Sequence, residues 1–273
     1  MRHRSQGLER RHDLAHRRLI QRRLDFDDLV YGIHAVDEAL AAGEELRAIH
    51  VAAHRTKDVA LRSLLAKAKE RNVPVRFEQR AFFDQLPFKA HQGVVAIAPP
   101  FPYVTLHELL ARKGSGTSRM VVVLDHLTDP HNVGAIVRTA EAAGADGLIL
   151  PSRRSAGVNA TVRKAAAGAA AYLPIARVTN IAETIRQMKK AGIWVVGADA
   201  APEATELASA DLARDLAVVI GGEGGGLSQL VRRECDYLVR IPMRGRVASL
   251  NASVAAAILI YEALRQRECS LRP

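Results

Sequence analysis

The chain is 273 residues long and 48% hydrophobic, which is enough to bury a sizeable core and to form two domains. Its formal net charge of +10 favours a polyanionic partner, in the first place nucleic acid. No apolar run approaches the roughly 18 residues that a membrane-spanning helix needs, and no apolar segment follows the basic N-terminus as it would in a secretory signal.

Residues 1–27 contain eight arginines and three histidines but few apolar residues. This composition is typical of a solvated, flexible extension that packs against nothing. Alternatively, a basic arm of this kind adds sequence-independent affinity for phosphate groups, and salt weakens such binding.

The pattern becomes globular in residues 28–98, where short helical and strand patterns predict a small α/β domain. The strands are expected over residues 46–53, 73–79 and 93–98, and the helices over residues 31–43, 58–72 and 81–86. Residues 99–118 combine prolines with the run GSGTS, which is typical of a linker.

Residues 119–268 form the second predicted domain, in which apolar strand patterns alternate with helical patterns. The strands are expected over residues 120–127, 145–151, 192–199 and 216–222. This alternation predicts an α/β fold with a mainly parallel sheet and helices on both faces. Ligands of such sheets bind beyond the carboxyl ends of the strands.

Two passages from strand to loop stand at that edge. In the first, the strand runs into Gly221–Gly226, a segment in which only Glu223 has a side chain. In the second, an apolar run ends at Pro242 and leads through MRGRVASLN into a final helical pattern. The glycine run lacks the lysine of a phosphate-binding Walker loop and the glycine spacing of a dinucleotide fingerprint. We expect one binding site built from both loops, with two ordinary turns as the alternative.

Asp125 and His126 could suggest a hydrolase triad together with Ser228 or Ser249. Adjacent residues at the end of a strand point to opposite faces, so the pattern argues against an Asp125–His126 hydrogen bond. No G-x-S-x-G motif is present either, and a hydrolase is not expected.

Two cysteines, Cys235 and Cys269, have no metal-type spacing. We therefore expect no metal site and two reduced thiols without a catalytic role.

The segment TDPHNVGAIVRTAEAAG predicts a helix, for which Asn132 is a good N-cap candidate. Arg138 follows six residues later, and Gly134 lies one turn before it, leaving the guanidinium room to reach across the helix start. Arg138 is either an ordinary surface residue or a cation that binds a phosphodiester or a developing alkoxide.

Ser249 and Asn251 stand at the start of the last helical pattern, where small polar side chains cap free backbone N–H groups. Capping explains one of the two. It does not explain both beside Arg244 and Arg246 on the same loop, so a binding role is expected as well.

Three segments, TDPHNVGAIVRTAEAAGADGLIL, VVIGGEGGGLS and IPMRGRVASLNASVAAAILIYEA, closely resemble the three motifs of the SpoU class of the SPOUT superfamily. Members of that class are RNA ribose 2′-O-methyltransferases that use S-adenosylmethionine. The resemblance covers about residues 120–267. It extends to YGIHAV and HQGVVA, which look like the RNA-binding domain of the RlmB/TrmH group, and is greatest to the RlmB type, which modifies a guanosine of 23S ribosomal RNA.

The resemblance implies a C-terminal trefoil knot, a rare exception to unknotted topology, and a homodimer with sites near the subunit interface. The cysteine usage favours a reduced, cytoplasmic setting. It assigns cofactor contacts to Gly221, Ile241 and Leu250. It also assigns catalytic roles to a larger group: Asn132, Arg138, Glu223, Ser249 and Asn251.

Arg138 matches the arginine proposed as general base in that family. Since a guanidinium with a pKa above ~12 stays protonated in proteins, we expect Arg138 to orient an RNA phosphate and to stabilise alkoxide charge. Glu223 could hold Arg138 by a charge-assisted hydrogen bond. Two alternatives remain, namely a methyltransferase acting on transfer RNA and a non-catalytic RNA-binding protein of the same fold.

Overall fold

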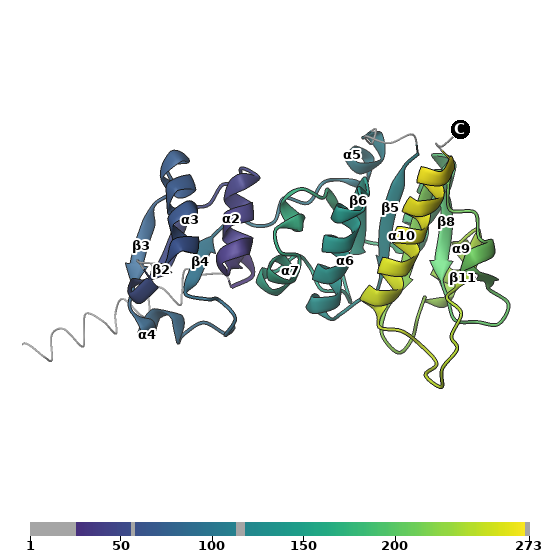
Figure 1. Ribbon diagram of the computed structural model, residues 1–273. Helices are drawn as coiled ribbons and strands as arrows, with labels where there is room; N and C mark the ends of the chain where they lie inside the picture. The colour runs from purple at the N-terminus through teal and green to yellow at the C-terminus, as the bar shows by residue number, and fades with distance from the viewer. Residues whose placement is uncertain (1–25, 56–57, 113–117, 271–273) are drawn as a thin grey trace, which may run out of the picture.

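The computed structural model describes residues 26–55, 58–112 and 118–270, which form two α/β lobes (Figure 1). We refer to residues 26–98 as the N-lobe and to residues 99–270 as the C-lobe. The prediction of residues 99–118 as a linker is wrong in part, because Leu106–Ala111 form a helix whose Leu109 is buried in the core of the C-lobe. The predicted basic extension, residues 1–27, lies outside the described residues except for its last two positions.

The N-lobe contains a four-stranded sheet in the order β1-β4-β2-β3. β2 and β3 are parallel, whereas β4 pairs antiparallel with both β1 and β2. Its elements are η1 (Phe26–Asp28), β1 (Leu29–Tyr31), α2 (Ile33–Ala41), β2 (Ala48–Ala52), η2 (Ala53–Arg55), α3 (Val59–Glu70), β3 (Val75–Glu78), α4 (Arg80–Phe83) and β4 (Val94–Ile97). The predicted strands and helices are all present, while the three-residue strand β1 was not predicted.

The C-lobe contains a seven-stranded sheet in the order β7-β6-β5-β10-β8-β11-β9, with every pairing parallel. Its strands are β5 (Met120–Asp125), β6 (Gly147–Pro151), β7 (Ile175–Val178), β8 (Trp194–Ala198), β9 (Thr205–Glu206), β10 (Leu216–Gly221) and β11 (Tyr237–Arg240). Its helices are α5 (Leu106–Ala111), α6 (Pro130–Ala142), α7 (Ala160–Ala165), η3 (Ala169–Ala171), α8 (Ile181–Lys190), η4 (Leu207–Ser209), α9 (Gln229–Glu234) and α10 (Ala252–Ser270). The predicted α/β fold with a parallel sheet is confirmed.

Helices cover both faces of the large sheet, and each face has its own apolar cluster. Ile136 of α6 and Leu259 of α10 belong to one cluster, whereas Ile185 of α8 and Val231 of α9 belong to the other. Because both faces are covered, β5 is buried along its whole length and its sequence MVVVLD is almost uninterruptedly apolar. No helix among the described residues is both long and apolar enough to cross a membrane.

α6 begins earlier than predicted. Its N-cap is Asp129, whose carboxylate accepts a hydrogen bond from the His131 N–H, and Pro130 occupies the first helical position. The prediction of Asn132 as N-cap is wrong, because an acid followed by proline already satisfies the helix start. Asn132 lies inside the first turn, where its buried side chain is available for other contacts.

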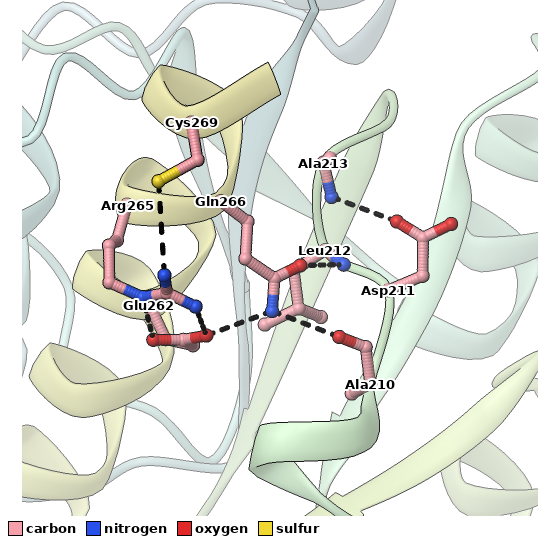
Figure 2. Close-up of polar contacts among 8 residues, drawn as sticks. All are labelled: Ala210, Asp211, Leu212, Ala213, Glu262, Arg265, Gln266 and Cys269. Atoms are coloured by element: carbon pink, nitrogen blue, oxygen red, sulfur yellow. Dashed lines mark hydrogen bonds and ion pairs between the residues drawn. The ribbon is translucent and has the colours of Figure 1, made fainter. Parts of the chain in front are cut away.

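α10 crosses the front of the large sheet in Figure 1 and is fixed at its C-terminal end. There the Gln266 amide accepts a hydrogen bond from the Leu212 N–H at 2.8 Å and donates one to the Ala210 carbonyl at 3.0 Å (Figure 2). The segment that receives these bonds leads into β10. The start of α10 therefore has a defined position at the carboxyl edge of the sheet.

Candidate active site

A cavity of about 620 Å³ lies at the carboxyl ends of β8, β10 and β11. It is enclosed by the glycine run after β10 and by the loop that leads into α10. Six of the eight predicted site residues line it: Gly221, Glu223, Ile241, Ser249, Leu250 and Asn251. The two strand-to-loop passages thus form one cavity, as predicted, and are not two unrelated turns.

The glycine run folds back on itself. The Gly226 N–H donates to the Gly222 carbonyl at 3.0 Å, and Gly226 has a φ of 62°, in the left-handed region that favours glycine. A Cβ atom on Gly221 would lie 2.1 Å from the Gly226 carbonyl carbon. The closed turn therefore requires glycine at the point where the strand ends, and no side chain there intrudes into the cavity.

Three side chains connect the glycine run, α6 and α10. The Asn132 amide donates a hydrogen bond to the Glu223 carboxylate, and the Asn251 amide donates one to the Asn132 side-chain oxygen at 3.0 Å. The Asn251 side-chain oxygen also accepts from the Ser253 N–H at 2.9 Å, which caps α10. Asn132 is only 6% exposed. These three residues, which lie far apart in the sequence, form one polar connection at the rim of the cavity.

Arg138 lies outside this connection. Its side chain is exposed, does not line the cavity, and forms no hydrogen bond or ion pair within the described parts of the chain. The expected pairing of Arg138 with Glu223 is wrong, because the Glu223 carboxylate accepts its hydrogen bond from Asn132. The room expected beside Gly134 is filled by α7, since a Cβ atom there would lie 2.4 Å from the Ala165 methyl group.

Asp125 and His126 do form a hydrogen bond, with 2.5 Å between Oδ1 and Nδ1, so the expectation of unsuitable geometry is wrong. The reason is the backbone of His126, whose φ of 58° turns its side chain back toward the strand end. The fully buried Asp125 carboxylate also accepts from the Ser228 N–H at 2.7 Å. Among the described residues no serine hydroxyl hydrogen-bonds to His126, and a hydrolase triad is not formed.

Sequence reasoning missed two charged residues of the cavity wall. Asp199 follows β8 directly, and its Oδ2 lies 3.2 Å from Nε of Arg232 on α9. An acid immediately after a buried parallel strand was the available signal, since such strand ends converge on the ligand.

The two cysteines are free thiols, as expected. Burial raises the pKa of Cys235 to about 12, so this thiol is neutral near pH 7. Cys235 packs near Gly197 of β8, where a Cβ atom would lie 3.0 Å from its sulfur. Its role in the protein is packing.

Comparison with known proteins places this architecture in a family. Residues 119–261 match the SpoU rRNA methylase family, and residues 29–104 match the family described as RNA 2′-O ribose methyltransferase substrate binding. The chain is 42% identical over 241 residues to the putative TrmH family tRNA/rRNA methyltransferase YacO of Bacillus subtilis, covering 88% of this chain and 96% of YacO.

The chain is also 43% identical over 242 residues to the uncharacterized tRNA/rRNA methyltransferase slr0955 of Synechocystis, covering 88% of this chain but only 63% of that longer protein. Among solved structures, the SpoU methyltransferase AviRb of Streptomyces viridochromogenes in complex with AdoMet superposes with a TM-score of 0.73 at 28% identity, covering 88% of this chain and 90% of AviRb.

The two lobes and the cavity therefore define the class of RNA methyltransferases. Within that class, the chain belongs to the SpoU rRNA methylase family. The family predicted from the three motifs is confirmed, and so is S-adenosylmethionine as the cofactor that the family uses.

Proposed function

We propose that the protein transfers a methyl group from S-adenosylmethionine to a ribose 2′-hydroxyl of RNA, and that the target is a guanosine of 23S ribosomal RNA, as in RlmB-type enzymes. The observation that carries the proposal is the hydrogen-bonded connection from Glu223 through Asn132 to Asn251 beside the cavity. This connection brings carboxylate and amide groups from three segments together beside the cavity, which supports a role in orienting a ribose next to the cofactor.

The cavity fits the cofactor. Its volume of about 620 Å³ lies within the range of about 300–1,000 Å³ typical of small-molecule sites. Gly221, Ile241 and Leu250 provide backbone groups and apolar surface, and the Glu223 carboxylate favours a cationic ligand with hydrogen-bond donors. The charge of Asp199 is balanced by Arg232, which also lines the cavity. When bound, S-adenosylmethionine supplies an electrophilic methyl group on a positively charged sulfur.

The protein's own residues must position the ribose. They must also stabilise negative charge on its 2′-oxygen as the hydroxyl proton leaves. Ser249 and Asn251 stand where the cavity opens, and their polar groups can orient a ribose. The exposed Arg138 guanidinium offers five N–H donors and no acceptor, so its role is to bind an RNA phosphate and to stabilise alkoxide charge. Holding the reacting groups in line can lower the barrier by about 7 kcal/mol or more.

The proposal includes a homodimer, a C-terminal trefoil knot and action in the cytoplasm. Exposed apolar side chains on α10 and on the loop before it support a subunit contact: Val247 of the loop is 69% exposed, and Val254 and Tyr261 of α10 are 47% and 49% exposed. The late strand β10 lies in the centre of the sheet, between β5 and β8. This order is compatible with a knot. Light scattering after gel filtration would measure the subunit number.

The test begins with methyl transfer from labelled S-adenosylmethionine to separated ribosomal and transfer RNA of a strain that lacks the gene. Modified positions are mapped by their resistance to alkaline cleavage, since that cleavage needs a free 2′-hydroxyl. Label in 23S RNA supports the proposed target, and label confined to transfer RNA identifies the alternative substrate. Saturable cofactor binding without transfer to either pool contradicts the enzymatic proposal.

The variant Arg138→Ala tests the site. We expect methyl transfer to be abolished while calorimetry finds unchanged binding of S-adenosylmethionine, because Arg138 does not line the cavity. The matched control is Arg138→Lys, which keeps the charge but loses the planar fork and should retain part of the activity. Turnover at the wild-type level in Arg138→Ala would remove this residue from the mechanism.

A further inference from the structure

The two lobes meet through α7, which lies at the boundary between them in Figure 1 and contacts β1 of the N-lobe. A buried ion pair lies at this contact. Nη1 of Arg163 on α7 donates to Oε2 of Glu44 in the N-lobe at 2.7 Å, and the two side chains are only 4% and 20% exposed. The Arg163 guanidinium also lies 5.2 Å from the centre of the Phe101 ring. A charge pair this well shielded from water is specific to one relative position of the lobes.

Neighbouring polar contacts fix the same arrangement. Nζ of Lys164 lies 3.4 Å from Oε1 of Gln92, which in turn accepts from the Ile33 N–H at the start of α2. The Tyr172 hydroxyl donates to the Glu38 carboxylate at 3.2 Å. These contacts join α7 and the segment that follows it to α2 and to Gln92 of the N-lobe.

The lobes also share apolar core. Ala160 of α7 is 4% exposed and belongs to the same cluster as Tyr31, Phe83 and Val95 of the N-lobe. A cluster that contains residues of both lobes loses buried area whenever the lobes separate. The contact is therefore part of the folded core and is not a loose tether.

α7 is in turn packed directly on the helix that contributes to the active site. A Cβ atom on Gly134 of α6 would lie 2.4 Å from the Ala165 methyl group and 2.7 Å from the Val162 carbonyl oxygen of α7. The same helix α6 carries Asn132, which hydrogen-bonds to Glu223 and Asn251 at the cavity rim. A continuous set of packed elements thus runs from the N-lobe through α7 and α6 to the active site.

We propose that α7 holds the N-lobe at one fixed position relative to the cavity, and that Arg163 and Glu44 are the pair that sets this position. The proposal rests on the proposed function. The N-lobe then binds one RNA element at a fixed distance from the methyl-transfer site. The protein therefore selects RNAs in which that element and the target ribose are separated by the same distance. Arg163 and Glu44 are then positioning residues that determine substrate specificity without contacting the reacting atoms.

The test is a charge exchange in the full-length protein. Arg163→Glu and Glu44→Arg each place like charges side by side at the lobe contact, and the double variant restores an opposite pair. We expect each single variant to lower kcat/KM on full-length substrate RNA by about tenfold or more, because misplacement by about 1 Å can cost a hundredfold. The double variant should recover most of this loss. Lys190→Glu, at the exposed end of the C-lobe helix α8, controls for the same change in net charge.

Two readouts separate positioning from general damage. Affinity for S-adenosylmethionine should be unchanged in every variant, which shows that the cavity is intact. A short RNA fragment that carries the modified nucleotide but not the rest of the substrate should be methylated equally by wild-type and variant proteins, because it cannot use both lobes at once.

Single variants with wild-type kcat/KM on full-length RNA, or a double variant as impaired as the singles, would overturn the proposal. If the reversed charges prevent folding, Tyr172→Phe and Glu38→Ala, which each remove the hydrogen bond between these two side chains, take their place in the same assay. Each should then lower kcat/KM on full-length RNA without changing transfer to the short fragment, and a wild-type value on full-length RNA would overturn the proposal. Failure of the proposed function is distinct, since the wild-type protein itself would then transfer no methyl group to RNA.

Discussion

The two ends of α10 differ in what their polar side chains do. At the start, Asn251 caps the helix and also donates to Asn132, which belongs to another segment of the active site. At the far end, Gln266 and Arg267 bind backbone groups of neighbouring segments. Gln266 bonds to residues 210 and 212 and also donates to the Glu262 carboxylate (Figure 2). Arg267 donates to the carbonyls of residues 118, 119 and 214. One end contributes to function, and the other anchors the helix so that the first end stays in place.

The largest expected effect is at the functional end. Asn251→Ala should lower methyl transfer about a hundredfold, because the connection to Asn132 and Glu223 is lost. The free energy of unfolding should fall by only about 1 kcal/mol, the usual value of an N-cap. Single-turnover kinetics and urea unfolding measure the two quantities.

Asn251→Asp is the matched control for this variant. The carboxylate keeps the capping acceptor for the Ser253 N–H but has no donor for Asn132. Stability at the wild-type level combined with impaired transfer is expected. Impaired stability with intact transfer would contradict the division between the two ends.

At the anchoring end, a substitution should lower the free energy of unfolding more than it lowers the activity. Arg267→Ala leaves three backbone carbonyls without their charged donor, at 3.1, 2.7 and 2.8 Å in the native protein. We expect a loss of about 3 kcal/mol in the free energy of unfolding, and an unchanged affinity for S-adenosylmethionine in the folded fraction. Thermal unfolding and calorimetry check both. A selective loss of cofactor affinity at full stability would show that this end, too, belongs to the site.

The smallest effect is expected at the surface pair beside Gln266. Hydrogen bonds from Arg265 lower the pKa of Glu262 to about 2, from an ordinary value of 4.5. Since the folded-state pKa is lowered, the stabilisation is fully present above pH 4.5 and is lost as the pH falls toward 2. Arg265 is 61% exposed, so Glu262→Gln should cost no more than about 1 kcal/mol at neutral pH.

Urea unfolding of wild-type protein and Glu262→Gln between neutral and acidic pH measures this difference, which should shrink as Glu262 becomes protonated. If the difference in the free energy of unfolding stays constant down to acidic pH, the Arg265–Glu262 ion pair does not contribute to stability.

Local patterns in the sequence predicted the cavity well. Two loops follow apolar strands, and parallel strands bring their carboxyl ends to one edge, so a shared site follows from periodicity and turn chemistry. The individual contact residues Gly221, Ile241 and Leu250 were assigned by the family resemblance, and all three line the cavity. The patterns were less reliable where one residue changes the backbone direction. The left-handed φ of His126 reverses the orientation expected from strand alternation, and Asp129 with Pro130 begins α6 before Asn132.

Contacts between distant segments were not predictable from these patterns. Arg163 and Glu44 are separated by 119 positions, and neither has a local signal that distinguishes it from an ordinary surface charge. The partner of Glu223 was missed for the same reason, because the choice between Asn132 and Arg138 depends on how α6 packs against α7 and on the face that each residue then presents.

The turn formed by the glycine run has a consequence for cofactor affinity. Its backbone hydrogen bond, from the Gly226 N–H to the Gly222 carbonyl, is made within the turn itself and needs no ligand to complete it. The Gly221 position tolerates no side chain, so this part of the cavity wall is formed by main-chain atoms, whereas side chains such as Met243 line other parts. A ligand that enters therefore orders few additional torsions, and more of its contact energy remains as net affinity.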